Sequence, residues 1–384
     1  MRKLDKERLE RILRERLSQQ MEYCRVSAAH LLVMQDGQEV CSICEGYQDW
    51  KTKEPLRPDA MYRLASMTKP VTSVAAMIAV DKGYFKITDK VEDYLPEFSD
   101  MSIGKSVDGK IVAGEKNKTP LRIWHLLTHC NGIMPKTPMG LQIIMDTPKA
   151  AYQSRDAMIA YAAAQPLAFE PETYTAYTGK VSFDMVTKII EQKSGMAYSD
   201  FVQQYIFDPL EIKDITYFPT DEQWERMLAP TDQVGGIDVV TIDLGKHTFE
   251  AMPLSYTGGG SGLAGSIADY AVFAEMLRNG GTYHGRRIFS VERLQEMTTP
   301  YVPPETPGRN SVSSWGLGVR VVDKEGVLPV GSFGWCGAYG THFWIDPVNK
   351  ITAIYMRSSR WYDSHGGGFI AEQFEKDVMA ALEP

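Results

Sequence analysis

Residues 59–98 read DAMYRLASMTKPVTSVAAMIAVDKGYFKITDKVEDYLPEF, and this stretch carries a serine and a lysine three positions apart. After Ser66, apolar residues recur at helical spacing as far as Gly83, a usual helix-ending residue, so the pattern predicts a helix between these two residues. Because residues three apart share one face of a helix, Lys69 can reach the Ser66 hydroxyl. Burial in an apolar helix lowers the pKa of a lysine, and the neutral amine can then serve as a base.

The Ser-x-x-Lys pattern is a weak signal when it stands alone. It occurs again at Ser102-Ile103-Gly104-Lys105, in a Gly- and Lys-rich segment that we predict to be a polar loop. At Ser66, the alternative interpretation is a helix N-cap serine followed by a lysine whose stem covers apolar surface. The choice between a catalytic pair and a structural pair therefore depends on the rest of the chain.

The segments around this stretch predict an antiparallel sheet flanked by helices. Ala28–Gln35 and Glu39–Gly46 are apolar segments on either side of the turn pair Asp36-Gly37, and they predict a β-hairpin. Towards the C-terminus, the pattern predicts strands at 316–322, 330–335, 341–345 and 351–356, followed by a helix at about 369–382. The fold class that follows is α+β.

Residues 89–254 have a mostly helical pattern that interrupts this sheet. The candidate helices are 124–129, 155–164, 180–194 and 198–207. The chain then returns through glycines 258–260 to a helix at 266–279, which begins with the capping-box pattern Ser266-x-x-Asp269. We therefore expect a discontinuous α/β domain, residues 1–88 and 255–384, with a mostly helical domain, residues 89–254, inserted in it.

Several segments of the chain, taken together and in order, resemble the serine β-lactamase and penicillin-binding-protein superfamily, in particular its class C-like esterase branch. These are the stretch 59–98, IWHLLTHCNGI (123–133), FEPETYTAYTGKVSFDMVTKIIEQKSG (169–195), FDPLEIKD (207–214), GGGSGLAGSIADYAVFAEMLRNGG (258–281) and SFGWCGAYGTHFWIDP (332–347). The resemblance spans nearly the whole chain. It implies a β-lactamase/DD-peptidase-like fold, an antiparallel sheet flanked by helices plus an inserted helical domain.

The resemblance also implies roles for three side chains. Ser66 matches the acylated nucleophile and Lys69 its base partner, while Tyr177 matches the catalytic tyrosine that acts as general base and acid. Tyr174 lies three residues earlier and is an alternative to Tyr177, and either tyrosine could instead be an amphipathic loop anchor. We prefer Tyr177 because its spacing from Phe169 fits the family pattern.

Trp335-Cys336-Gly337 occupies the place of the family's Lys-Thr-Gly, on a strand expected beside the serine. Gly337 would let a substrate approach the backbone closely, so these three residues are the expected substrate-binding strand. The backbone N–H groups of Ser66 and Ala338 are the expected oxyanion-hole donors. The alternative is a glycine-containing strand with a tryptophan in the core.

Two departures from the β-lactamase pattern bear on the substrate. The family's Tyr-x-Asn reads Tyr177-Thr178-Gly179 here, so the amide that would hold an acylamino group is absent. Trp335 replaces a lysine, so an aromatic surface replaces a cation that could pair with a substrate carboxylate. Both changes favour neutral esters over β-lactams. Arg357 and Arg360 could restore a positive charge, although solvated surface arginines are the commoner case.

Composition and the remaining motifs exclude several other classes of protein. A net charge of −8 argues against a nucleic-acid partner. No stretch is long and apolar enough to cross a membrane, and the first residues lack the apolar region of a secretory signal, so we expect a cytoplasmic protein. The five cysteines, among them Cys41 and Cys44 on opposite faces of one strand, are expected to be free thiols.

Neither a cofactor nor a metal is expected. Gly260-x-Gly262-x-x-Gly265 matches the dinucleotide fingerprint in its letters but lacks the preceding buried strand and the later acidic residue. His125 and His129 have the spacing of a zinc helix but lack the glutamate after the first histidine.

The interpretation that follows is a serine hydrolase that cleaves small carboxylic esters through an acyl-enzyme on Ser66. An acyltransferase that uses the same acyl-enzyme is the first alternative, because nothing in the sequence separates water from an alcohol as the acceptor. A weak β-lactamase or peptidase, or a non-catalytic penicillin-binding-like sensor, is the second. The expected partner is a small-molecule ester or acyl donor, while the natural acyl group and the oligomeric state stay open.

Overall fold

The hairpin predicted around Asp36-Gly37 lies inside the main sheet. Strands β1 (Ala28–Gln35) and β2 (Gln38–Asp49) pair antiparallel, and Asp36 and Gly37 have φ values of 50° and 81°. Positive φ at both central residues is typical of the two-residue turns that Asp-Gly forms between strands. The predicted hairpin is confirmed, and β2 continues beyond the predicted end at Gly46.

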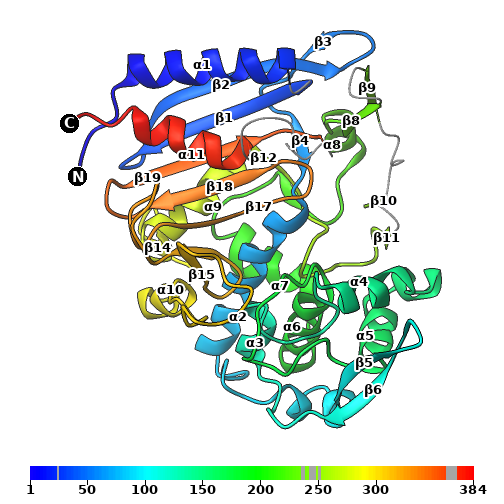
Figure 1. The fold of residues 1–384 in the computed structure, drawn as a ribbon. Helices are drawn as coiled ribbons and strands as arrows, with labels where there is room; N and C mark the ends of the chain where they lie inside the picture. The colour runs from blue at the N-terminus through cyan, green and yellow to red at the C-terminus, as the bar shows by residue number, and fades with distance from the viewer. Residues whose placement is uncertain (24–25, 235–237, 242–247, 250–251, 360–369) are drawn as a thin grey trace.

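The computed structural model describes residues 1–384 except 24–25, 235–237, 242–247, 250–251 and 360–369 (Figure 1). Its largest sheet, among the described residues, has eight antiparallel strands in the order β15-β16-β17-β18-β19-β1-β2-β3. The strands besides the hairpin are β3 (Glu54–Pro55), β15 (Ser313–Trp315), β16 (Arg320–Val322), β17 (Phe333–Cys336), β18 (His342–Asp346) and β19 (Ile351–Met356). The predicted α+β class, with an antiparallel sheet flanked by helices, is confirmed.

One predicted strand is wrong in its extent. The sequence predicts a continuous strand over 316–322, whereas β15 ends at Trp315 and β16 begins at Arg320. Gly318 between them has a φ of 72°, a left-handed conformation that breaks an extended strand. Its N–H donates to the carbonyl of Leu127, so the chain turns here to contact the helical part.

The outer face of the sheet is covered by the two ends of the chain. Helix α1 (Lys6–Tyr23) buries Leu9, Leu13 and Leu17, each at most 1% exposed, in a cluster shared with helix α11 (Ile370–Ala380). In Figure 1 both helices lie on the same side of the sheet, and the two termini lie close together. These leucines lie on one face of an amphipathic helix, and that face is buried against the sheet.

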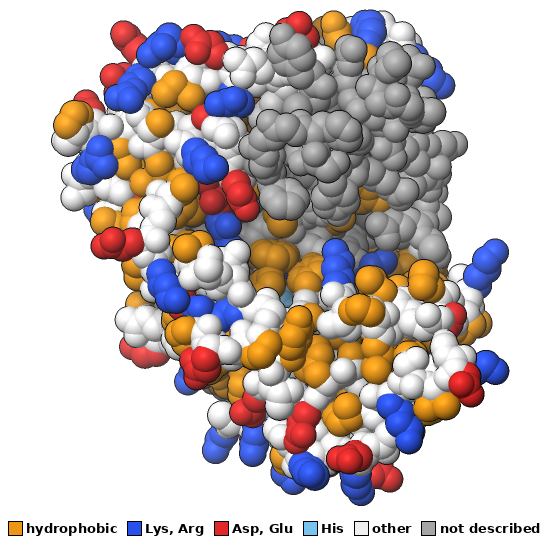
Figure 2. All heavy atoms as spheres, in the orientation of Figure 1, with side chains coloured by type: hydrophobic (Ala, Val, Ile, Leu, Met, Phe, Trp, Pro, Cys, Tyr) orange, Lys and Arg blue, Asp and Glu red, His pale blue; other side chains and the backbone are white. Residues whose placement is uncertain are grey.

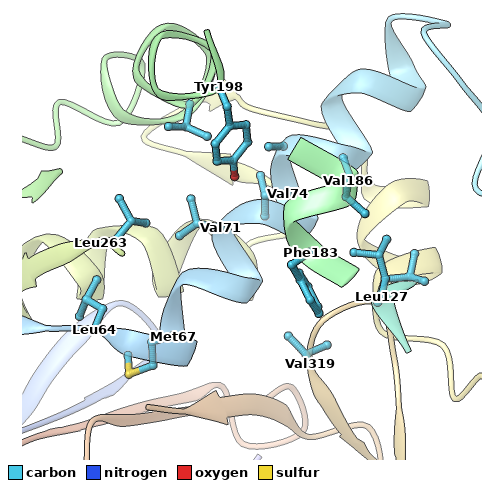
Figure 3. Close-up of a cluster of buried hydrophobic side chains, with 14 of the residues drawn as sticks. Leu64, Met67, Val71, Val74, Leu127, Phe183, Val186, Tyr198, Leu263 and Val319 are labelled. Carbon is cyan, nitrogen blue, oxygen red and sulfur yellow. The ribbon is translucent and has the colours of Figure 1, made fainter. Parts of the chain in front are cut away.

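The inner face packs on helix α9 (Ile267–Arg278), and the apolar cluster on this side continues into helix α2 (Thr68–Asp81). Figure 3 shows α2 at the centre of this core, with Val71 and Val74 among side chains from distant segments, including Leu263 and Phe183. Buried residues make up α2 from Thr68 to Ala79, which is why its sequence is apolar almost all round. This burial fixes the first turn of α2 in place.

The part of the chain between the two halves of the sheet is mostly helical. Its helices are α3 (Ile123–Leu127), α4 (Pro138–Met145), α5 (Arg155–Ala163), α6 (Val181–Ser194), α7 (Tyr198–Val202), continued by a π-helical segment at Gln203–Phe207, and α8 (Asp221–Glu225). The predicted helices are present within a few residues of their expected ends. The loop predicted at Ser102 is wrong, because Ser102 begins strand β5 (Ser102–Val107), which pairs with β6 (Lys110–Lys116).

A small three-stranded sheet joins the helical part to the rest. Strand β12 (Ala264–Ser266) pairs with β4 (Met61–Arg63) on one side and with β7 (Ile215–Thr216) on the other. One buried apolar cluster also continues from α6 to α9. The division into a discontinuous domain and an inserted domain stays a prediction. The remaining paired strands are β8 (Thr231–Val234) with β9 (Asp238–Thr241), β10 (Thr248–Phe249) with β11 (Met252–Pro253), and β13 (Thr282–Tyr283) with β14 (Arg286–Arg287), before helix α10 (Val291–Met297).

The capping box predicted at Ser266 forms only in part. The Ser266 hydroxyl accepts the N–H of Asp269 at 3.3 Å, as expected for an N-cap. The Asp269 carboxylate instead accepts the N–H groups of Lys213 and Asp214. It therefore joins α9 to the loop before β7 rather than closing the box on Ser266.

The described cysteines are free thiols, as predicted. Cys41 lies in the cluster on the outer face of the sheet, and Cys44 packs against the inner cluster. Cys130 and Cys336 are also unpaired, and Cys24 lies outside the described residues. Within the described residues, no helix has the length and apolar character needed to cross a bilayer.

We expect Gly334→Ala to destabilise the protein. A Cβ at Gly334, in the buried strand β17, would lie 2.1 Å from the carbonyl oxygen of Phe343, which belongs to the neighbouring strand. Overpacking of this kind costs about 1–3 kcal/mol, enough to lower the midpoint of thermal unfolding by several degrees. Gly326→Ala is the control, because nothing lies within 4 Å of its added Cβ. Equal midpoints for the two variants would contradict this account of the strand packing.

Candidate active site

Ser66 lies in a tight turn that leads into α2. It belongs to a 3₁₀ segment, Ala65–Met67, and α2 itself begins at Thr68, so the predicted helix starts two residues too early. Ala65 has a φ of 46°, an uncommon conformation for a residue with a side chain. Such outliers gather at functional sites, where the surrounding structure holds them in place. The turn leaves Ser66 half-buried at the edge of a hollow, one helical turn before Lys69.

Lys69 is completely buried and surrounded by oxygen atoms. Its Nζ lies 3.2 Å from Ser66 Oγ, 2.5 Å from the carbonyl oxygen of Gly179 and 2.8 Å from that of Gly260. Burial lowers the pKa of the Lys69 ammonium from its usual range to about 7. At this value the neutral amine is a substantial fraction of the population near neutral pH.

Charged groups on α6 and in the loops modify this pKa in opposite directions. Asp184, fully buried on α6, raises the pKa of Lys69, and the ammonium groups of Lys180 and Lys136 lower it. Asp184 accepts hydrogen bonds from the Tyr256 hydroxyl at 2.7 Å and the Gly259 N–H at 2.8 Å. Burial raises the pKa of Asp184 itself. The pKa of Lys69 therefore depends on these neighbouring charges as well as on burial.

Tyr177 is the tyrosine that the fold brings to Ser66. Its Oη lies 2.6 Å from Ser66 Oγ, and the Nζ of Lys69 lies 5.0 Å from the centre of its ring. Lys136, an exposed residue, has its Nζ 5.1 Å from the same ring centre. Tyr174, the alternative from the sequence, packs on Phe169 with 5.3 Å between the ring centres.

His129 packs against Tyr177, and His125 has a different partner. The Nδ1 of His129 accepts the N–H of Thr178 at 3.1 Å, and its ring centre lies 4.6 Å from that of Tyr177. Burial lowers the pKa of His129 well below its usual range, so the ring is neutral. His125 instead hydrogen-bonds through Nε2 to Glu172 at 2.9 Å. The two histidines thus have separate partners despite their four-residue spacing.

Trp335 forms an aromatic wall beside Tyr177. Their ring centres lie 5.4 Å apart, and Trp315 adds a third ring at 4.5 Å from Trp335. The strand then passes close to the serine turn: a Cβ at Gly337 would lie 2.4 Å from the carbonyl oxygen of Leu64. A glycine is required here because this backbone contact leaves no room for a side chain. Burial raises the pKa of the neighbouring Cys336 thiol, which keeps it protonated.

A hollow of about 150 Å³ opens in front of Ser66. It is lined by Ala65, Ser66, Lys136, Tyr177, Gly179, Lys180, Met252, Ser261, Gly262, Ala338 and Tyr339. Ser66 and Ala338, the predicted oxyanion-hole pair, both belong to this lining, and their role as donors stays a prediction. Arg357 is buried, packs against Gly340 and is not part of the lining, and Arg360 lies outside the described residues.

The sequence did not single out Asp184, Trp315 or the backbone role of the glycine loop. An acidic residue in the apolar first turns of α6 is a usable signal, because a buried carboxylate needs partners. The glycines match a dinucleotide fingerprint, yet here Gly260 offers its carbonyl to Lys69, and a Cβ there would lie 2.7 Å from the Cα of Lys180. Close approach of the two backbones accounts for the glycine at position 260.

Known proteins of similar length resemble this chain over most of its sequence. The chain is 25% identical to the "Acyltransferase calJ" of Penicillium decumbens, covering 90% of this chain and 87% of that protein. It is 23% identical to "Esterase EstB" of Burkholderia gladioli, covering 89% and 88% of the two chains. The solved structure of "EstCE1, a hydrolase with promiscuous acyltransferase activity" superposes with a TM-score of 0.80 at 19% identity, covering 98% of each chain.

A comparison with models of protein families finds a match over most of the sequence. The family model described as Beta-lactamase matches residues 13–365, a range that includes the serine turn, Tyr177 and the strand of Trp335. The fold has the corresponding sheet, flanking helices and helical part. The protein belongs to the Beta-lactamase family.

Proposed function

We propose that this protein is a serine hydrolase that cleaves small carboxylic esters through an acyl-enzyme on Ser66. The observation that carries the proposal is the position of Ser66 Oγ, within hydrogen-bonding distance of both Lys69 Nζ and Tyr177 Oη. A nucleophile, a base of lowered pKa and a second proton carrier are what acyl transfer from an ester requires. A purely binding protein has no physical need for the three together.

The hydrogen bonds of Lys69 suit its role as the base. A neutral amine has two N–H groups and one lone pair. If the N–H groups donate to the carbonyl oxygens of Gly179 and Gly260, the lone pair is left to accept the proton of Ser66. The pKa of about 7 makes this neutral form available near neutral pH. Ser66 Oγ can then attack the ester carbonyl as its proton moves to Lys69.

Tyr177 completes the proton path to the leaving group. As the tetrahedral intermediate collapses, the bond to the alcohol oxygen breaks, and the Tyr177 hydroxyl donates its proton to that oxygen. Lys69 then returns the serine proton to the tyrosine oxygen. We assign the negative charge on the former carbonyl oxygen to the N–H groups of Ser66 and Ala338. Water attacks the acyl-enzyme in the second half of the reaction, and the same groups move its proton.

Neutral esters suit this site better than β-lactams. Trp335 stands where the family has a lysine, so no cation at this position can pair with a substrate carboxylate. Its ring packs beside Tyr177 and, like Cys336 and Gly337, does not line the hollow in front of Ser66. Gly179 has no side chain to hold an acylamino group. "Esterase EstB" and the EstCE1 hydrolase support an ester substrate, as relatives of similar length and fold.

Acyl transfer to an alcohol is the second candidate. "Acyltransferase calJ" is as similar to this chain as the esterase relative, and EstCE1 is a hydrolase with promiscuous acyltransferase activity. Both reactions begin with the same acyl-enzyme, and they differ only in whether water or an alcohol attacks it.

Ser66→Ala, Lys69→Ala and Tyr177→Phe should each lower kcat/KM for p-nitrophenyl acetate by about 10²-fold or more, the scale of a lost nucleophile or general base. Tyr174→Phe is the matched control and should change it less than twofold, because that ring packs on Phe169. Intact-mass spectrometry of native protein and Ser66→Ala locates the acyl adduct. A larger loss in Tyr174→Phe, or native turnover of nitrocefin that rivals ester turnover, would contradict the proposal.

The pH dependence should reveal the lysine. Since the neutral amine is the active form, kcat/KM is expected to rise about tenfold per pH unit below about 7 and then level off. Asp184→Asn removes a charge that raises the pKa of Lys69, so the rise should move to lower pH. Lys136→Ala removes a charge that lowers this pKa, so the rise should move to higher pH. Shifts in the same direction for both variants would exclude Lys69 as the titrating base.

Addition of an alcohol separates hydrolysis from acyl transfer. With p-nitrophenyl butyrate and increasing 1-butanol, a hydrolase should release butyric acid and p-nitrophenol in equal amounts throughout. A transferase should form butyl butyrate at the expense of the acid, which gas chromatography measures directly. Predominant butyl butyrate at millimolar butanol would overturn hydrolysis in favour of the second candidate.

A further inference from the structure

A second hollow adjoins the one in front of Ser66. It has a volume of about 180 Å³ and is lined by Met134, Ile144, Tyr152, Met158, Thr178, Gly179, Lys180 and Val181. Gly179 and Lys180 line both hollows, so this short segment is their common wall. The rest of the second lining comes from α4, α5, the first residue of α6 and the loops beside them, and it is mostly apolar; the hydroxyl of its polar residue Thr178 donates to the carbonyl oxygen of Ile133. Figure 2 shows hydrophobic side chains gathered at the lower right of the molecule, where α4 and α5 lie in Figure 1.

We propose that the second hollow is the binding site for the apolar end of the acyl group, a six-carbon chain or a phenyl ring. This inference rests on the proposed function and deepens it, because it assigns the chemical class of the acyl group that Ser66 carries. The proposed group is neutral, because apart from the segment 178–180 the lining consists of methionine, isoleucine, tyrosine and valine side chains.

Gly179 is the residue that connects the two hollows. Its carbonyl oxygen lies 2.5 Å from Lys69 Nζ, which itself lies 3.2 Å from Ser66 Oγ, so the segment is next to the nucleophile. A Cβ built on Gly179 would meet no atom within 4 Å, so the space beside its Cα is open. An acyl chain on Ser66 can therefore pass Gly179 where a larger side chain would stand in its path.

The volume of the second hollow suits a small apolar group. Apolar cavities of about 150 Å³ bind benzene, and this hollow is slightly larger. Each buried methylene contributes up to about fourfold in binding, from about 0.8 kcal/mol. Four methylenes separate acetyl from hexanoyl, so we expect native kcat/KM for hexanoate to exceed that for acetate by at least tenfold.

The test is the ratio of kcat/KM for p-nitrophenyl hexanoate to that for p-nitrophenyl acetate. Ile144→Trp fills the second hollow from α4 and should lower this ratio by at least about tenfold. Met145→Trp is the matched control, because Met145 is the next residue on the same helix, is 73% exposed and does not line the hollow. It should leave the ratio within twofold of the native value.

A second variant guards against misfolding of the first. Ile144→Ala enlarges the hollow and should move the preferred chain from hexanoate towards octanoate or decanoate. An unchanged chain-length profile in Ile144→Ala, together with an equal ratio in Ile144→Trp and Met145→Trp, would overturn the inference. So would an effect confined to the alcohol side, in which Ile144→Trp discriminates hexyl acetate from methyl acetate but treats hexanoate and acetate alike.

The failure of this inference can be distinguished from failure of the proposed function. If native protein turns over p-nitrophenyl acetate and forms an acetyl adduct on Ser66, but shows no preference for hexanoate, only the acyl site is wrong. If no ester is cleaved and no adduct forms on Ser66 with any chain length, the proposed function is wrong.

Discussion

The burial of one lysine ammonium is the constraint on which the site depends. Lys69 is fully enclosed, and its Nζ contacts oxygen atoms of Ser66, Gly179 and Gly260, from three separate segments of the chain. A buried charge is costly unless its donors are satisfied, so these segments must meet at one point for the fold to be stable. The same burial lowers the pKa of Lys69 to about 7. Burial of Lys69 is therefore the common cause of its oxygen contacts and of its availability as a neutral amine.

The surrounding structure keeps these three segments together. Asp184 holds the glycine loop through the N–H of Gly259, and it places a negative charge within reach of Lys69. The apolar residues of α2 anchor the lysine from the other side, since α2 is buried in the core against α6 and α7 (Figure 3). Tyr177 is held in turn by His129, whose Nδ1 accepts the N–H of the next residue. Packing therefore holds Ser66, Lys69 and Tyr177 next to one another.

The proposed selectivity for neutral acyl groups follows from what is absent as much as from what is present. Gly179 leaves open the space beside its Cα, and Trp335 supplies an aromatic wall next to Tyr177. An open apolar passage and an aromatic wall both favour neutral acyl groups, because neither offers a partner for a charge. The exposed Lys136 near the Tyr177 ring acts on Lys69 through its field, an effect that salt would weaken.

The sequence alone determined the hairpin at Asp36-Gly37, the apolar helix after Ser66, the strand 351–356 and the family, because turn chemistry, residue periodicity and ordered motifs are local properties of the chain. It did not determine the break between β15 and β16, the strand at Ser102 or the partners of Asp269, since each depends on contacts with distant segments. The spacing in the sequence favoured Tyr177 over Tyr174, and the fold brings the Tyr177 hydroxyl to Ser66 while the Tyr174 ring packs on Phe169. The burial of Asp184 and the second hollow are likewise decided by the tertiary structure, because packing determines which polar group is enclosed and which space is left unfilled.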